Sequence, residues 1–208
     1  MTDVMVPQSR HGDPLGSLLT GLLSTGLELT GTVLGNVQLM NWRTRELTIV
    51  AQHGFTEDFV NFFRVVKASE GTACARALSA RHSVIVEDVL VDPAFAPFRQ
   101  VALESGFRAV QSTPLISSSG AFLGVLSTHF PGQHRPTENE MRALSRVAEL
   151  AANAIIRHRA QARANGPARE NGDDKQIASS LAAMARSYHA LDRADRLLQR
   201  FGNDRSRR

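Results

Sequence analysis

The chain has 208 residues, of which 42% are hydrophobic and 21% are charged, with a formal net charge of +4. These values are ordinary for one soluble globular domain with appendages. The basic surplus lies in residues 157–208, which hold 12 basic and 6 acidic residues, whereas the rest of the chain is slightly acidic. A nucleic-acid-binding domain would concentrate Lys and Arg on its folded face, so we expect no nucleic-acid partner.

Cys74 is the only cysteine of the chain. An intramolecular disulfide, a Cys-rich zinc site and a two-thiol redox cycle are therefore excluded, and a reducing cytoplasm is the expected compartment. The leucine-rich run 15–34 is diluted by Gly, Ser and Thr, and no basic cluster precedes it. We therefore expect neither a signal peptide nor a membrane span, and no membrane partner.

The first predicted element is an amphipathic helix that follows a disordered start at residues 1–12. Asp13 is a suitable N-cap and Pro14 a suitable first helical residue. Leucines then repeat at helical spacing, at Leu15, Leu18, Leu19, Leu22, Leu23 and Leu27. Two interpretations of this apolar face stay open: it packs on its own sheet, or it pairs with a second copy of the chain.

A hairpin and three short elements are predicted next. Residues 32–41 and 46–52 alternate as half-buried strands do, with Val37 and Leu39 on the face opposite Gln38. A helix follows Thr56 and carries Phe59, Phe62 and Phe63. A second short helix carries Cys74, Ala77 and Leu78. A strand is then predicted over 83–87, and a short helix over 99–105 is closed by Gly106.

Residues 106–130 are predicted to form the central hairpin, with Ser117–Gly120 supplying the turn. Polar residues interrupt both of its apolar strands. Gln111 and Thr113 share one face and Ser112 takes the other, while Ser127 and His129 share a face with Leu123 and Val125. Polar groups in an apolar wall are typical of a small-ligand cavity, although cross-strand partners would also satisfy them.

The last part of the chain is predicted to be helical. Thr137 and Glu140 form a capping box that begins a long helix ending near Ala164. Residues 165–174 read as a linker, and residues 175–208 as a basic helical tail with a short heptad pattern. The order of elements favours an α+β domain with an antiparallel sheet and helices on its faces.

Three segments carry a family resemblance: GNVQLMNWRTRELTIVAQHGF (35–55), SEGTACARALSARHSVIVEDVLVDPAF (69–95) and SGFRAVQSTPLISSSGAFLGVLSTHF (105–130). Together they resemble a GAF domain of the type attached to bacterial sensor histidine kinases. The resemblance covers about residues 15–160, and we predict a GAF-like sensory domain over residues 13–164. The resemblance implies a sheet of five or six antiparallel strands and a ligand cavity between one sheet face and the helical connections. It also implies dimerising terminal helices and a signal passed through the helix from Thr137, as in two-component systems.

Enzymatic chemistry finds little support in the residues. Too few residues follow the GAF-like region for an ATP-binding domain, and His189 lacks the acidic neighbour of a kinase phosphoacceptor box. Cys74 is followed by Ala75, not by the histidine that typically follows a bilin-attaching cysteine, and it has no resolving thiol for a sulfoxide reductase. Since no histidines are paired at i, i+4, we predict no metal site; the residues identify no cofactor.

The main hypothesis is a cytoplasmic, non-enzymatic sensory protein that forms a homodimer and responds to a small molecule or to a signalling partner protein. Two alternatives stay open: a ligand-free interaction scaffold, and an enzyme that depends on Cys74 or His129. We predict no catalytic residues. The candidate ligand-binding residues are Gln111, Thr113, Ser127, His129, Cys74 and Arg108.

Overall fold

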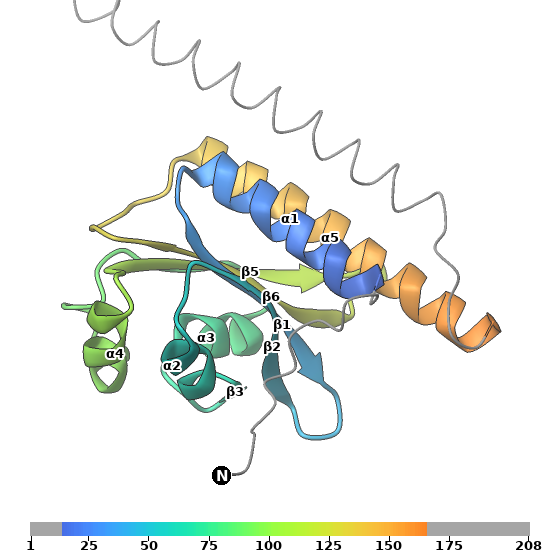
Figure 1. Ribbon diagram of the computed structural model, residues 1–208, viewed down its shortest axis with the longest axis horizontal. Coiled ribbons are helices and arrows are strands. Elements are labelled where there is room, and N and C mark those ends of the chain that lie inside the picture. The colour runs from blue at the N-terminus through green and yellow to red at the C-terminus, as the bar shows by residue number, and fades with distance from the viewer. Residues whose placement is uncertain (1–13, 166–208) are drawn as a thin grey trace, which may run out of the picture.

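The computed structural model describes residues 14–165, which form a six-stranded antiparallel sheet with helices on both faces (Figure 1). The strand order is β3-β2-β1-β6-β5-β4. The elements are α1 (Pro14–Thr30), β1 (Leu34–Asn41), β2 (Glu46–His53), α2 (Glu57–Phe62), β3 (Val65–Lys67), α3 (Ala73–Ala80), β4 (Val84–Val86), η1 (Ala96–Phe98), α4 (Arg99–Glu104), β5 (Ala109–Ile116), β6 (Phe122–Phe130) and α5 (Glu138–Asn165). The predicted α+β class with five or six antiparallel strands is confirmed.

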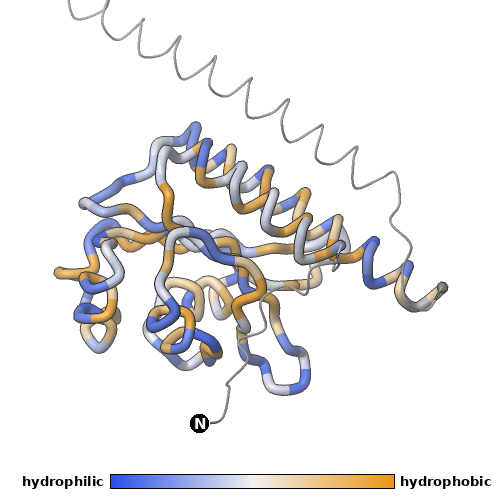
Figure 2. The backbone as a smooth tube through the Cα atoms, in the orientation of Figure 1, coloured by the Kyte–Doolittle hydropathy of each residue, from blue (hydrophilic) through white to orange (hydrophobic). Residues whose placement is uncertain are grey.

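Helices α1 and α5 lie side by side across one face of the sheet (Figure 1). The leucines of α1 that were predicted to form its apolar face are largely buried here, with Leu19, Leu22 and Leu23 at most 1% exposed. In Figure 2, apolar and polar stretches alternate along both helices, as expected where one stripe of each helix is buried. The apolar face of α1 therefore packs on its own domain.

The predicted capping box begins α5. The Thr137 amide donates to Glu140 Oε2 at 2.6 Å, and the Glu140 amide donates to Thr137 Oγ1 at 3.2 Å. Small buried residues such as Ala148 and Ala151 let α5 lie close to α1 and the sheet. The last turns of α5 project beyond the sheet (Figure 1), so this helix carries the chain away from the domain.

The opposite face of the sheet is covered by α2, α3 and α4, with an aromatic core between (Figure 1). Thr56 caps α2 and Thr72 caps α3, since each threonine Oγ1 accepts from the backbone amide three residues on. Phe59 of α2 stacks on Phe55 with ring centroids 3.7 Å apart. The helical connections are thus held to the sheet largely through phenyl rings.

Strand β3 and a bulge in the central hairpin were not predicted. β3 has only three residues, which is too short for a period-2 pattern to be recognised in the sequence. It is identified in the structure because Val66 pairs with Leu47 of β2. The register of β5 and β6 shifts between Leu115 and Ile116. Leu123 consequently packs with the α1–α5 core while Val125 packs with the aromatic core, so the predicted shared face of these two residues is wrong.

Several predictions fall on other parts of the chain. The disordered start, the linker after Asn165 and the heptad tail lie outside the residues that the structure describes. Within residues 14–165, no helix combines the length and the hydropathy needed to cross a membrane.

Candidate functional site

A polar row runs across the three central strands on the face that α2 and α3 cover. Asn36 of β1 lies opposite Ser127 of β6, which lies opposite Ser112 of β5. The two serine hydroxyls are hydrogen-bonded, with their oxygen atoms 2.8 Å apart. Antiparallel register therefore brings three polar residues, distant in sequence, to one line on an otherwise apolar wall.

Gln38 and His129 extend this row along β1 and β6, each two residues from its polar neighbour and so on the same face. Asn36, Gln38 and His129 are at most 5% exposed. Each also has one polar atom without a hydrogen-bond partner: Asn36 Oδ1, Gln38 Oε1 and His129 Nδ1. Buried polar atoms in folded proteins are nearly always paired, so three such atoms in one place require a reason.

These residues line one cavity between the sheet and the helical connections. Its other wall is formed by the rings of Phe59, Phe63, Phe95 and Phe107, and its remaining lining by Thr72, Ala73, Cys74 and Val110. The free volume of the cavity is about 30 Å³. That space suits about one or two water molecules in the conformation described.

The cavity carries no formal charge at neutral pH. Its lining contains no Asp, Glu, Lys or Arg, and burial lowers the pKa of His129 to about 3, so the imidazole is neutral. Burial also raises the pKa of the Cys74 thiol, although a hydrogen bond with Thr72 Oγ1 at 3.3 Å acts in the opposite direction. Cys74 is therefore protonated at neutral pH and is a poor nucleophile.

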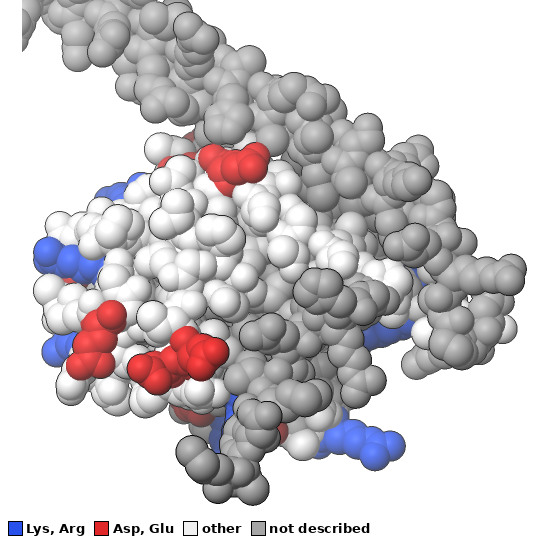
Figure 3. Space-filling model, viewed as in Figure 1, with Lys and Arg blue, Asp and Glu red and all other residues white. Residues whose placement is uncertain are grey.

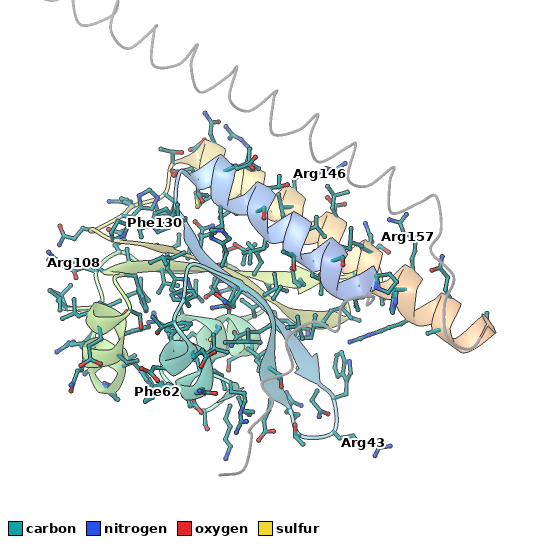
Figure 4. The ribbon with its side chains drawn as sticks, in the orientation of Figure 1. Arg43, Phe62, Arg108, Phe130, Arg146 and Arg157 are labelled. Carbon is teal, nitrogen blue, oxygen red and sulfur yellow. The ribbon has the colours of Figure 1, made fainter. Side chains whose placement is uncertain are left out.

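The arginines of the connecting segments are engaged elsewhere. Arg108 binds Asp88 through two hydrogen bonds of 3.0 and 2.7 Å, and Arg76 binds Asp92 at 2.8 Å. Hydrogen bonds from Arg108 and Gln133 hold the pKa of the Asp88 carboxyl well below its usual range. Figure 4 shows Arg108 near the same end of the molecule as Phe130, at the end of β6. These pairs fasten the segment between β4 and α4.

The structure divides the predicted ligand-binding residues into two groups. Ser127, His129 and Cys74 line the cavity, whereas Gln111, Thr113 and Arg108 do not. Gln111 and Thr113 alternate with the cavity-lining residues of β5 and face the α1–α5 layer, where Gln111 Nε2 donates to Thr113 Oγ1 at 3.4 Å. Gln111 and Thr113 therefore do not form the cavity wall that the sequence predicts. Alternation along a strand separates its two faces, but it does not tell which face borders the cavity.

Asn36, Gln38 and Ser112 were not among the predicted site residues. Gln38 was placed on the polar side of a half-buried strand, yet it is 1% exposed, because α2 and α3 cover that face too. The sequence does contain an indication of this site: Asn36 and Gln38 are two carboxamide side chains separated by one residue in an otherwise apolar strand. Among residues 14–165, no group of three or more His, Cys, Asp or Glu side chains is placed to hold a metal ion.

The sequence model of the GAF domain family matches residues 13–156, more than half of the chain. The chain belongs to the GAF domain family. The sequence resemblance to a GAF domain is thus confirmed, and a domain of a sensor histidine kinase shares the fold.

Individual relatives support the same fold. A methyl sulfide methyltransferase-associated sensor of Methanosarcina acetivorans is 27% identical over 147 residues; the match covers 69% of this chain but only 14% of the relative. A domain of a two-component sensor histidine kinase from Sinorhizobium meliloti superposes with a TM-score of 0.58 at 18% identity, covering 72% of this chain and 96% of that one. The GAF domain of a phosphoenolpyruvate-protein phosphotransferase from Coxiella burnetii gives 0.62 at 18% identity, covering 72% and 86%.

Proposed function

We propose that this GAF domain is a sensory module that binds a small molecule in the cavity and passes the change to the α1–α5 layer. The observation that carries the proposal is the set of unpartnered buried atoms of Asn36, Gln38 and His129 around one space. Leaving a buried polar group unpaired costs about 1–3 kcal/mol. A ligand that supplies the missing hydrogen bonds would recover part of that cost, which favours the bound state.

A change in the cavity can reach the α1–α5 layer directly through β6. Ser127 faces the cavity, while its neighbour Leu126 faces the helices. At Gly26 of α1, a Cβ atom would lie 3.7 Å from Leu126 Cδ2 and 3.3 Å from Leu144 Cδ2 of α5. Because strand β6 contacts both helices at this point, a ligand-driven shift of the strand would move the α1–α5 pair and the helix that leaves the domain.

We further propose that two copies of the chain associate through the outer face of α1. Ser17, Thr20 and Gly21 are exposed on that face, and Glu28 is the only charged residue of the helix. Figure 3 shows uncharged atoms over the middle of α1, with acidic side chains near the upper end of the helix pair. Such a face favours association with a like surface over contact with a charged partner.

The proposed role is non-enzymatic and cytoplasmic. A protonated Cys74 and a neutral, buried His129 suit recognition better than nucleophilic or proton-transfer chemistry. The second candidate is a ligand-free scaffold that engages a signalling partner protein. The small free volume of about 30 Å³ favours this alternative, because water molecules alone would fill it.

A thermal-shift screen of metabolites against three versions of the full chain tests the sensory proposal. We expect at least one compound to raise the melting temperature of the wild type and of Gln111→Leu, whose amide faces the helices, but not of Asn36→Leu. If every compound leaves the wild type unchanged, or stabilises Asn36→Leu equally, the ligand-free scaffold is the better account.

A further inference from the structure

We infer that the cavity takes a compact, uncharged ligand that presents hydrogen-bond donors to the sheet and a flat apolar side to the phenyl rings. This inference rests on the proposed function, since it concerns the same cavity, and it adds the chemical class of the ligand. Charge, hydrogen bonding and the shape of the walls each restrict that class.

Charge is the first restriction. Every polar group in the lining is neutral: amides, hydroxyls, a thiol and an unprotonated imidazole. An anion or cation that enters such a space loses its water without gaining an opposite charge, which is strongly unfavourable. Arg76 and Arg108 of the connecting segments, which could otherwise meet an anion, are paired with Asp92 and Asp88. Phosphates and carboxylates are therefore disfavoured.

Hydrogen bonding is the second restriction. The carboxamide oxygens of Asn36 and Gln38 have no donor within the part of the chain that the structure describes, and both side chains project from the same face of β1. Alternate residues of a strand are roughly 6–7 Å apart, so one small molecule can reach both. An amide N–H or a hydroxyl is the neutral group that matches these acceptors. His129 Nδ1 offers a third contact on the neighbouring strand.

The aromatic wall is the third restriction. Phe59, Phe63, Phe95 and Phe107 come from three different parts of the chain, and their rings line the apolar part of the cavity. Phenyl rings pack well against a flat apolar surface. A molecule with one polar edge and one apolar face therefore matches both walls.

The α2 side of the cavity is the side that can make room for a ring-sized molecule. The sheet wall is fixed by the hydrogen-bonded ladders of β1, β5 and β6. Helix α2 has only six residues, and Phe63 beside it meets Phe59 and Phe98 through ring contacts with centroids 4.8 and 6.0 Å apart. Ring contacts can re-form after a sliding movement more readily than a ladder can.

Three flat probes of nearly equal size separate these possibilities: benzamide is neutral with N–H donors, benzoate is an anion and benzamidinium is a cation. Each is titrated against the full chain by calorimetry. We expect benzamide to bind at least tenfold more tightly than benzoate or benzamidinium. We also expect Gln38→Leu to weaken benzamide binding about tenfold or more, because a ligand donor loses its acceptor.

Gln111→Leu is the matched control. Gln111 is as buried as Gln38 and also has an unpartnered Oε1, but it lies on the other face of the sheet. Its replacement should change benzamide binding less than twofold. Asn36→Leu repeats the test from a second position should Gln38→Leu fold poorly, and circular dichroism checks folding of all variants.

The outcomes separate the ligand class from the sensory function. Tighter binding of benzoate or benzamidinium than of benzamide, lost in Gln38→Leu, overturns the neutral class and leaves the sensory function standing. Equal loss of benzamide binding in Gln38→Leu and Gln111→Leu overturns the assigned contacts. If none of the three probes binds, the ligand class is rejected, and the sensory function then depends on the metabolite screen alone.

Discussion

At the scale of single residues, the domain keeps polar groups where apolar ones would pack better. Gln38 is buried with an unpartnered carbonyl oxygen beside a cavity. A residue selected only for stability at this position would be apolar. A glutamine at this position is explained if its carbonyl oxygen accepts a hydrogen bond from a bound ligand.

The first prediction follows from this conflict between stability and binding. Gln38→Leu should raise the free energy of unfolding of the ligand-free protein by about 1 kcal/mol, since a buried unpaired acceptor is removed and the volume is nearly kept. Urea denaturation followed by circular dichroism measures the change. A loss of more than about 1 kcal/mol would show that the oxygen has a hydrogen-bond partner in solution and is not kept free for a ligand.

His129 provides a prediction of pH dependence. Its pKa is about 3 in the folded chain and about 6.5 when unfolded, so between these values the unfolded chain binds the additional proton. The free energy of unfolding should therefore be highest above pH 6.5 and should fall as the pH is lowered toward 3, by up to about 1.4 kcal/mol per pH unit.

Replacement of the imidazole isolates its contribution to that dependence. In His129→Gln the slope between pH 6.5 and 4.5 should be shallower than in the wild type, as measured by urea denaturation at each pH. Asp88 contributes little to the slope in this window, because its stabilising contribution is complete above its ordinary pKa of 3.8 and is lost only as the pH falls below that value toward its lowered pKa. Identical slopes in the two proteins would contradict the burial of a neutral His129.

At the scale of elements, the cavity depends on the close approach of β1 and β6. A Cβ atom at Gly124 would lie only 2.0 Å from the carbonyl oxygen of Gln38 on the neighbouring strand. Any side chain there would push the two strands apart and displace both edges of the polar row. Glycine at this position is thus required by backbone packing and not by an unusual backbone angle.

Gly124→Ala is therefore expected to lower the free energy of unfolding by about 3 kcal/mol or more, because overpacking meets rigid backbone. Gly132→Ala is the control, since nothing lies within 4 Å of a Cβ atom there and the residue is exposed between β6 and α5, outside the proposed interface. That change should alter the free energy of unfolding by less than about 0.5 kcal/mol. Thermal unfolding of both variants compares them, and a harmless Gly124→Ala would contradict the described strand pairing.

Most elements were predictable because their signals are local. The capping box at Thr137, the cap at Thr56 and the alternation of β1 and β2 each act over a few residues. β3 was missed because its pairing with β2 is a tertiary contact, and the bulge near Leu115 was missed because register is set by two strands together.

The site was only partly predictable for the same reason. Of the predicted ligand-binding residues, Ser127, His129 and Cys74 line the cavity, whereas Gln111 and Thr113 lie on the other face. When a strand is buried on both sides, its sequence has no clearly polar face, so the pattern does not show which face borders the cavity. Only the positions of α2 and α3 decide which side holds the cavity.

At the scale of the whole molecule, α1 connects the sensory and oligomeric parts of the account. Its buried face contacts β6 and α5, and its exposed face is nearly free of charge. A movement of β6 would therefore shift α1 and change the proposed interface. Ligand binding and dimerisation are therefore expected to influence each other.

Hydrodynamic measurement tests the proposed interface. We expect the wild type to sediment as a dimer and Gly21→Arg to shift it toward monomer, since a buried unpaired charge at an interface costs several kcal/mol. Ser118→Arg, in the exposed turn between β5 and β6, is the control and should leave the dimer intact. A wild-type monomer, or equal behaviour of both variants, would argue against the α1 interface.

Ligand binding in the cavity and its coupling to α5 are tested most directly by titrating the isotope-labelled chain with benzamide and following the amide chemical shifts. We expect saturating shifts at Asn36, Ser112 and Ser127 around the cavity, and shifts with the same midpoint at Leu126 and Leu144 in the helix-facing core. Shifts confined to exposed residues, without saturation, would contradict a ligand site in this cavity and its coupling to α5.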